Sequence, residues 1–475
     1  MIPVLIWIML GLYGLFYNQT YVDEAKYLIK GWLMATGQVG YYSTPEFFYQ
    51  HLPGGLLWYG WGQKLFGPSL LTARIQSFII GLLIIFFAAK LAKVINPQAK
   101  NRILPLLSLA PVAILYYSSA VPQSLAALSL TLAFYCLFKN KDLLAALFFT
   151  LTFIVRENFL FTLLLYFAYL IFYQKKPWLK QLSLSLIIIG LFFLPNWPGV
   201  LNVLKNFPGV SWLLPVDSAE KAVLGLNWMV KNYPPGLYLR AILEFGVVYC
   251  GFWLAGLMAF TAKTAKAKLG AQDPRWRLLL AAVGLNLLAH TWSAFNLTPR
   301  AIIPYFAYIF PLAAVIIAVI STGKKLKFYW LYLILALISL NFSAIFQKPN
   351  QLNTINVLNR SAQALKPIID NRQKIIWLAE PMSLYLAGRI SYYPLINHTN
   401  FYKPSADTTT VRRLGYWNEA MLNQWLAETD LLVVDPNRLK IANLQLELND
   451  WEKLPAPDFI WPGNLEFYFN KATAR

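Results

Sequence analysis

The chain has 475 residues, of which 58% are hydrophobic and 13% are charged, and its formal net charge is +20. A mean hydropathy of +0.48 excludes an ordinary soluble domain and indicates a membrane protein. The basic residues flank apolar stretches and form no arm or groove, which argues against a nucleic-acid partner. Cys136 and Cys250 both lie in apolar segments without a CxxC spacing, so neither a disulfide framework nor a zinc site is predicted.

Apolar stretches long enough to cross a bilayer recur from Ile2 to about Phe346. The first, MIPVLIWIMLGLYGLFY, has no basic start and no small-residue cleavage site, so we expect it to remain as a spanning helix. Long loops are predicted near residues 18–67 and 198–240. The remaining spans are predicted near residues 70–92, 103–117, 122–138, 143–155, 158–173, 182–197, 241–261, 278–294, 301–320 and 328–345, which gives about eleven crossings.

Lysine and arginine gather in alternate loops, which the positive-inside rule assigns to the cytoplasm. These loops carry Lys90, Lys93, Lys100 and Arg102; Lys139 and Lys141; Lys175, Lys176 and Lys180; Lys263, Lys266, Lys268, Arg275 and Arg277; and Lys324, Lys325 and Lys327. Most acidic residues before the C-terminal part fall on the opposite side. We therefore expect the chemistry on the extracytoplasmic face.

From about Gln347 the composition becomes that of a soluble domain. The segments IIWLAE and LLVVDP are typical of short buried strands, whereas NEAMLNQWLAE and RLKIANLQLEL have helical spacing. This alternation predicts a small α/β domain, residues 347–475, on the outer side of a membrane domain of residues 1–346. The predicted fold class is an α-helical polytopic membrane protein with a C-terminal extracytoplasmic α/β domain.

Asp23 and Glu24 follow the first span and open a segment with helical spacing, VDEAKYLIKGW. Such a helix would lie along the membrane surface, with its aromatic residues at the headgroup level. An enzyme that takes a sugar from a lipid carrier needs a carboxylate at this depth, because the carboxylate can orient or deprotonate the acceptor beside the carrier's phosphate. An equally open alternative is that Asp23 is an N-cap and Glu24 is favoured by the helix dipole.

Further along the first long loop, His51 precedes Pro53 and Gly54, and LFGPS precedes Arg74. The series D-E-x-x-Y, H-x-P-G, L-F-G-x-S and Arg resembles the GT-C superfamily of integral-membrane glycosyltransferases, in particular protein mannosyltransferases, aminoarabinose transferases and the RgtA/B/C/D-like group. The resemblance implies transfer from a polyprenyl-phosphate-linked sugar, with inversion at the anomeric carbon. It also implies an integral protein of the bacterial inner (plasma) membrane whose active site is extracytoplasmic.

The resemblance assigns roles to residues of the first loop. Asp23, with Glu24, takes the place of the family's catalytic carboxylate. Lys26, Tyr27, His51 and Arg74 become candidates for binding the substrate. His51 is the nearest match to an acidic residue or histidine that often precedes the loop's proline in this family, and Glu46 is a second acidic candidate.

Charged residues at membrane depth supply further candidates. Arg156 and Glu157 stand between two apolar stretches, and Arg300 opens TPRAIIPYFAYIFP, which also contains Tyr305. An arginine near the site would neutralise the charge that grows on a departing phosphate. The alternatives are that Arg156 and Glu157 are satisfied by neighbouring helices, and that Arg300 only reaches the headgroups.

Neither a P-loop nor a G-x-G-x-x-G motif occurs in the cytoplasmic loops, which argues against a nucleotide-sugar donor. No cofactor is required, and the acidic doublet alone does not indicate a metal site, although a divalent ion could assist. A transporter or flippase of lipid-linked sugars and a scaffold that displays the tail remain alternatives. Transporters tend to show repeated halves and polar residues near the midplane, whereas here the acidic residues gather at one surface. The sugar and the acceptor, whether lipid, glycan or protein, stay open.

Overall fold

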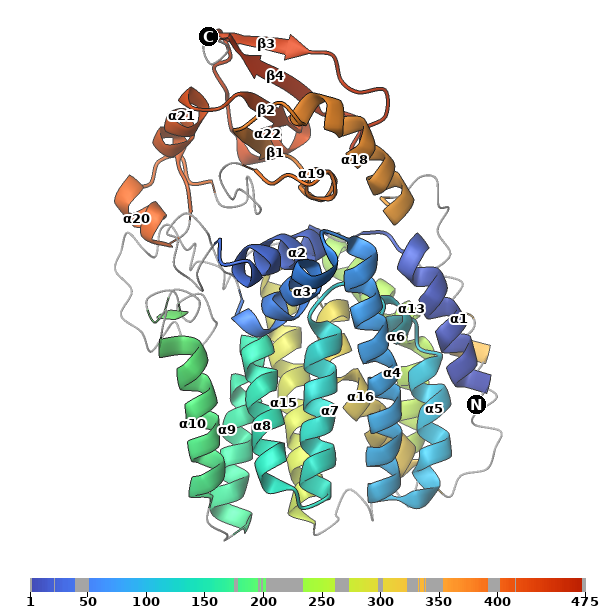
Figure 1. Cartoon of the computed structure of the whole chain (residues 1–475). Coiled ribbons are helices and arrows are strands. Elements are labelled where there is room, and N and C mark those ends of the chain that lie inside the picture. The colour runs from blue at the N-terminus through green and yellow to red at the C-terminus, as the bar shows by residue number, and fades with distance from the viewer. Residues whose placement is uncertain are drawn as a thin grey trace.

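The computed structural model combines an upright helical bundle, a layer of two short helices across one end of it, and an α/β body above that layer (Figure 1). It describes residues 2–20, 22–38, 51–174, 178–194, 234–260, 273–297, 302–322, 353–391, 402–414 and 416–471, together with 197, 200, 201, 332, 334–336 and 338. The described helices of the bundle are α1 (Ile2–Tyr17), α4 (Leu70–Ile95), α5 (Lys100–Ser108), α6 (Pro111–Tyr116), α7 (Gln123–Phe138), α8 (Asp142–Val155), α9 (Leu160–Tyr169), α10 (Leu179–Phe193), α13 (Pro235–Phe260), α15 (Pro274–Leu297) and α16 (Ile302–Ile320).

Most described helices of the bundle coincide with predicted spans, but the prediction of one continuous span over residues 103–117 is wrong. There the chain forms the separate helices α5 and α6, because Pro111 occupies the first turn of α6 and cannot continue α5. Among the described residues, Leu70–Ile95 and Ile303–Ile320 are long and apolar enough to cross a membrane by length and composition. Most of the predicted span near 328–345 and most of the loop near 198–240 lie outside the described residues.

The outer surface of the bundle is apolar where that of a soluble protein would be polar. On α10 the side chains of Leu186, Ile187 and Leu191 are 56–71% exposed. The inner surface, in contrast, carries small and hydroxylated residues that let helices approach closely, such as Ser185 of the same helix, which bonds Thr150 of α8. This distribution is what a helix bundle surrounded by lipid requires.

The segment predicted as the first long loop contains two helices, α2 (Val22–Ala35) and α3 (Pro53–Phe66). The prediction of a helix after the first span is met by α2, whereas α3 replaces what we expected to be loop. The two helices pack backbone against backbone at Gly31 and Gly60, where a Cβ on either residue would overlap a carbonyl group of the other helix. Glycine is therefore required at both positions, and the contact fixes α2 in place.

The α/β body has a four-stranded sheet with the order β1-β2-β4-β3. Its strands are β1 (Ile375–Leu378), β2 (Leu431–Val434), β3 (Trp451–Leu454) and β4 (Glu466–Asn470), and its helices are α18 (Ile355–Ile369), α19 (Met382–Leu386), α20 (Thr408–Leu414), α21 (Glu419–Ala427) and α22 (Pro436–Ala442). Strands β1 and β2 are parallel and fully buried, as expected for strands with helices on both faces. The remaining pairs are antiparallel.

The α/β body is attached to the layer of α2 and α3. Asn353 bonds Thr20 in both directions, since its amide Nδ2 donates to the Thr20 carbonyl and its own carbonyl accepts from the Thr20 N–H. Tyr385 of α19 donates its hydroxyl to Gln63 of α3 and packs edge-on against Trp32 of α2. The α/β body therefore helps to hold α2, the helix that carries Asp23 and Glu24.

Glu380 lies where α19 faces α2 and is 3% exposed. One carboxylate oxygen accepts the Met382 N–H, and the other has no hydrogen-bond partner among the described residues. Burial raises the pKa of Glu380 to about 7, helped by the nearby Glu24 and opposed by the Met382 N–H and by the positive charges of Arg438 and Lys26. The carboxyl group is therefore neutral in the most stable form of this interface.

The close contact of α2 and α3 predicts that Gly60→Ala destabilises the protein by about 3 kcal/mol or more, because the new methyl group meets backbone that cannot move aside. Thermal unfolding of the purified protein in detergent measures this loss. The control is Gly284→Ala on α15, where a Cβ meets nothing within 4 Å and alanine favours the helix. Equal stability of the two variants would contradict the contact.

The buried carboxyl group predicts a pH dependence. Because the pKa of Glu380 rises from an ordinary 4.5 to about 7 on folding, its stabilising effect is complete below pH 4.5 and is lost as the pH rises through 7. The full loss is about 3 kcal/mol. Thermal unfolding of the whole chain at about pH 5 and about pH 8 should show this slope in the wild type and not in Glu380→Gln. Glu452→Gln, on an exposed side chain, should keep the wild-type slope, and a slope retained by Glu380→Gln would refute the assignment.

Candidate active site

The first turn of α2 places Asp23 at the surface, with its side chain 61% exposed and Lys26 Nζ 3.2 Å from its carboxylate. Asp23 is the second residue of the helix, so it is not the N-cap. Although enclosure by the protein disfavours its charge, the charge and the hydrogen bond of Lys26, together with the charge of Arg156, hold the pKa of Asp23 below its ordinary value. The site therefore presents an ionised and accessible carboxylate beside an ammonium group.

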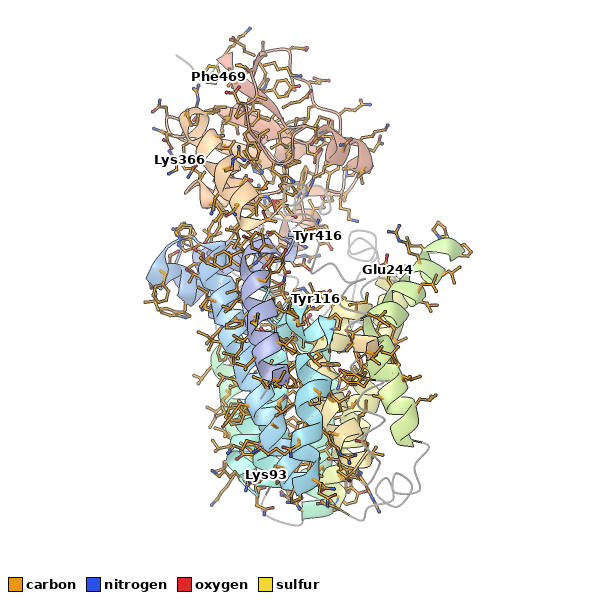
Figure 2. The ribbon with its side chains drawn as sticks, turned by 90° about the vertical axis from the view of Figure 1, so that its right-hand side faces the viewer. Lys93, Tyr116, Glu244, Lys366, Tyr416 and Phe469 are labelled. Atoms are coloured by element: carbon orange, nitrogen blue, oxygen red, sulfur yellow. The ribbon has the colours of Figure 1, made fainter. Side chains whose placement is uncertain are left out.

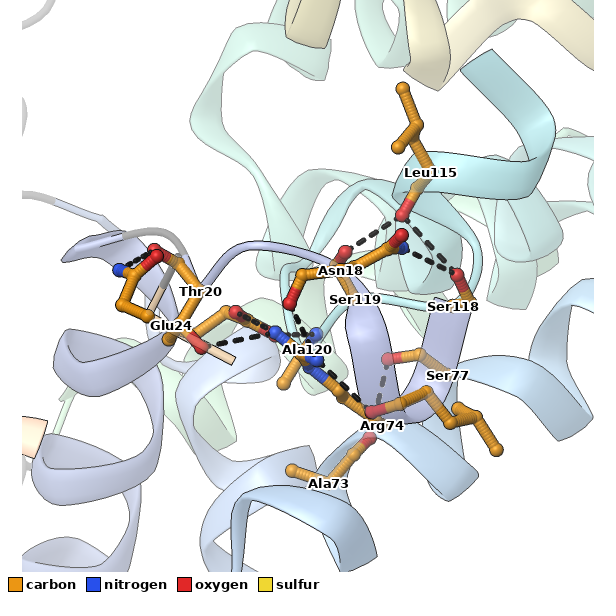
Figure 3. Close-up of polar contacts among 12 residues, drawn as sticks. Asn18, Thr20, Glu24, Ala73, Arg74, Ser77, Leu115, Ser118, Ser119 and Ala120 are labelled. Atoms are coloured by element: carbon orange, nitrogen blue, oxygen red, sulfur yellow. Dashed lines mark hydrogen bonds and ion pairs between the residues drawn. The ribbon is translucent and has the colours of Figure 1, made fainter. Parts of the chain in front are cut away.

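Glu24, in contrast, is fully buried and forms an ion pair with Arg74 of α4, which is also fully buried. The guanidinium group binds both carboxylate oxygens of Glu24, at 3.0 and 2.9 Å (Figure 3). Its remaining donors reach the Leu15 and Asn18 carbonyls and the Thr20 hydroxyl, while Glu24 also accepts the Ala120 N–H. The contacts thus do not support the predicted catalytic role of Glu24 or the predicted substrate contact of Arg74. The pair instead joins α1, α2, α4 and the turn before α7.

His51 and Glu157 form a second pair, with His51 Nδ1 2.7 Å from a Glu157 carboxylate oxygen. The other Glu157 oxygen accepts the Leu52 N–H, just before α3 begins at Pro53. Burial and Arg156 lower the pKa of His51 in spite of the nearby Glu157 carboxylate. A neutral imidazole that donates from Nδ1 to a carboxylate has Nε2 as a hydrogen-bond acceptor, which is the arrangement of a general base.

Arg156 connects these pairs to the bundle. It stands between the end of α8 and a single turn of 3-10 helix, η2 (Glu157–Phe159), and its extended backbone interrupts the two apolar stretches. Its side chain is buried and donates to the hydroxyl of Tyr27 at 2.8 Å. The ring of Tyr27 in turn lies parallel to that of His51. The structure therefore brings together Asp23, Lys26, Tyr27, His51, Arg156 and Glu157 at one end of the bundle.

A group of rings lies beneath Arg156. Its guanidinium carbon is 5.5 Å from the ring centre of Tyr308, and Tyr308, Tyr305 and Phe159 surround the imidazole of His290. Four buried polar atoms here have no hydrogen-bond partner among the described residues: Arg156 Nε, the Tyr308 hydroxyl oxygen and both ring nitrogens of His290. Unpaired polar groups are rare in protein interiors, so this cluster is suited to a polar guest such as water or a phosphate oxygen.

Tyr308 is the site residue that we did not predict from sequence. The spacing in YFAY contains the signal, because Tyr305 and Tyr308 are one helical turn apart and face the same side. Arg300 and Glu46 lie outside the described residues. In the part of the chain that the structure describes, no group of three His, Cys, Asp or Glu side chains is placed to hold a metal ion.

No family model and no curated protein matches this sequence. Solved structures do match. ArnT from Cupriavidus metallidurans bound to undecaprenyl phosphate has a TM-score of 0.62 at 9% identity, over 99% of this chain and 97% of that one. The chain has the ArnT fold. The apo state of the same protein matches with a TM-score of 0.61 at 11% identity, over 99% and 98% of the two chains.

ArnT is a GT-C aminoarabinose transferase, so the fold implied by the sequence resemblance is confirmed. The match covers both chains almost completely, so the helical fold resembles that of ArnT, a polytopic membrane protein, over the whole chain.

The pair of Glu24 and Arg74 predicts that Glu24→Ala destabilises the protein by about 3–5 kcal/mol, because it leaves the buried guanidinium group without its counter-charge. Thermal unfolding in detergent tests this. The matched control is Glu244→Ala, which removes the partner of Arg240 in a pair that is partly exposed and should cost less than about 1 kcal/mol. Two variants of equal stability would show that the buried pair has no special structural role.

Proposed function

We propose that this chain is a glycosyltransferase that moves a sugar from a polyprenyl-phosphate-linked donor to an acceptor at the extracytoplasmic membrane face, with inversion at the anomeric carbon. The fold supports it, since the chain is similar over its whole length to an ArnT structure that contains undecaprenyl phosphate. The observation that carries the proposal is local. The exposed carboxylate of Asp23 lies beside the ammonium group of Lys26, and the buried cation of Arg156, which Tyr27 joins to α2, is near enough to help lower the pKa of Asp23. Transfer from a lipid-linked phosphosugar needs a carboxylate for the acceptor and a cation for the phosphate.

In this proposal Lys26 and Arg156 bind the donor phosphate. Arg156 lies over the ring of Tyr308, close to His290. The Tyr308 hydroxyl and the ring nitrogens of His290 have no hydrogen-bond partner among the described residues, so they could also bind phosphate oxygens. When the bond between the sugar's anomeric carbon and the phosphate oxygen breaks, that oxygen gains negative charge. Fixed cations and donors in a site of low dielectric stabilise the charge without reorganisation. Arg300 and Tyr305 remain further candidates for contacts with the donor.

Asp23 orients the acceptor on the opposite side of the anomeric carbon from the phosphate. The acceptor oxygen or nitrogen forms the new bond to this carbon and gives up its proton, and the departing polyprenyl phosphate takes the bonding electrons. The lowered pKa of Asp23 suits a carboxylate that orients the acceptor and stays ionised. In this proposal His51, held through Nδ1 by Glu157, takes up the acceptor's proton through Nε2. No cofactor is required for this reaction.

The orientation in the membrane follows from the positions of basic side chains. Lys93 lies at the end of the bundle opposite the α/β body (Figure 2). Lys139 and Lys141 belong to the next predicted cytoplasmic loop and Arg275 to a later one, and Arg275 donates to Asn140, which stands between the two lysines. By the positive-inside rule this end faces the cytoplasm. Asp23 and the α/β body are then extracytoplasmic, in the inner membrane that we expect from the sequence.

The proposal predicts that Asp23→Asn reduces sugar transfer by about 100-fold or more and leaves binding of undecaprenyl phosphate unchanged, because the carboxylate does not hold the phosphate. Mass spectrometry of envelope glycans and lipids from cells with the wild-type chain, the variant or neither measures transfer. Native mass spectrometry of the purified proteins with undecaprenyl phosphate measures binding.

Two further variants serve as a control for transfer and as a test of phosphate binding. Asp458→Asn, on an exposed residue of the α/β body, should transfer sugar at the wild-type rate. Lys26→Met should weaken undecaprenyl phosphate binding about 10-fold through the loss of one charge-assisted contact. Full transfer by Asp23→Asn would refute the role of this carboxylate. Movement of intact lipid-linked sugar across vesicles without cleavage would favour the flippase.

A further inference from the structure

A cavity of about 300 Å3 lies between the α/β body, the C-terminal end of α2 and the turn that joins α3 to α4. Its described lining includes Trp32, Gln38, Gln373, Tyr385, Arg389 and Ser391. Trp32 follows Asp23 by nine residues, or about 2.5 helical turns, so the two side chains leave α2 on opposite sides. The cavity is therefore separate from the candidate active site.

The chemistry of the lining favours an anionic headgroup. Arg389 is the only charged residue among the described lining residues. One of its nitrogens donates to the backbone carbonyl of Asp370. The described lining contains no carboxylate that could neutralise the guanidinium group. Gln38, Gln373 and Ser391 add amide and hydroxyl groups. One positive charge among neutral hydrogen-bonding groups matches a single phosphate diester.

The aromatic part of the lining indicates the depth of the cavity. Trp32 and Tyr385 meet edge to face, with ring centres 6.2 Å apart. Residues of this kind gather at the headgroup level of a membrane. Below them, α3 exposes Trp61, Leu65 and Phe66 at 50%, 71% and 72%. The cavity thus stands at the boundary between headgroups and acyl chains.

An apolar stripe continues from this boundary into the bilayer. Pro68 lines the cavity and lies two residues before α4, and α4 exposes Ile75, Ile79, Leu83 and Phe86. Their spacing of four, four and three residues places them on one face of the helix. From the first to the last, the stripe is about 16 Å long at 1.5 Å per residue, which is about half of the hydrocarbon core and so one leaflet.

We propose that this cavity binds the headgroup of a phosphate-bearing lipid of the outer leaflet, with acyl chains along the α4 stripe. The lipid joins the α/β body, through Arg389 and Tyr385, to α2, through Trp32. It thereby stabilises the position of the helix that carries Asp23. The site does not depend on the proposed glycosyl transfer, because its lining shares no residue with the candidate active site.

The test uses the purified whole chain, delipidated in detergent, and measures binding by native mass spectrometry and stability by thermal unfolding. The three probes are phosphatidylglycerol, diacylglycerol with the same chains, and inorganic phosphate. Phosphatidylglycerol should bind and raise the unfolding temperature, whereas the other two should do neither. Arg389→Gln should weaken phosphatidylglycerol binding about 10-fold or more, since it removes a charge-assisted contact.

Controls separate lost binding from lost structure. Arg360→Gln removes the same charge from an exposed side chain of the same body and should bind like the wild type. Gln38→Leu, beyond the end of α2, should weaken binding by several-fold without changing the unfolding temperature in the absence of lipid. The proposal is overturned if both cavity variants bind phosphatidylglycerol normally, if diacylglycerol stabilises equally, or if inorganic phosphate alone gives the full effect.

Discussion

The buried ion pair of Glu24 and Arg74 determines where the candidate active site can be. Arg74 is fully buried, and its donors are shared among the end of α1, the start of α2 and the carboxylate of Glu24. A charge inside a membrane protein is stable only when its partners satisfy it. Since Glu24 points inward to meet Arg74, its neighbour Asp23 points to the surface at the same helix end. The adjacent carboxylates thus lie in different surroundings, since Glu24 is held in a buried ion pair and Asp23 is exposed.

The same requirement explains the other charged residues at this depth. Arg156 interrupts two apolar segments, and its neighbourhood compensates for it through the Tyr27 hydroxyl, the face of Tyr308 and the adjacent carboxylate of Glu157. Glu157 is itself held by His51 and the Leu52 N–H. Within the described part of the chain, this compensation leaves Arg156 Nε, the Tyr308 hydroxyl and the His290 ring nitrogens without a hydrogen-bond partner. A bundle that needed Arg156 only for stability would gain by replacing it with an apolar residue, so the incomplete pairing favours a role in binding.

The sequence was sufficient to predict the membrane-protein class, the helix that carries Asp23 and Glu24, and a resemblance whose fold the comparisons confirm. Hydropathy depends only on the apolar residues within one segment of sequence. It therefore located α4, α7 and α16 well. It could not distinguish Glu24 from Asp23, because both have the same chemistry and only the distant Arg74 separates them. It also missed α3, since glycines such as Gly60 lower helical propensity and their purpose, the close contact with α2, is tertiary.

The α/β body also affects the candidate active site through tertiary contacts. It contacts α2 and α3 through Asn353, Tyr385 and the region around Glu380. These contacts include a carboxyl group whose pKa is raised to about 7, the amides of Asn353 and Gln63, and an edge-to-face ring pair. The α/β body lies on the side of α2 away from the bundle (Figure 1), so the position of α2 depends in part on its contacts with that body. Displacement of the body would move Asp23 relative to Arg156, which belongs to the bundle. We infer that the α/β body affects the site by fixing the position of α2 relative to the bundle. This coupling gives the contacts between the α/β body and α2 a physical role.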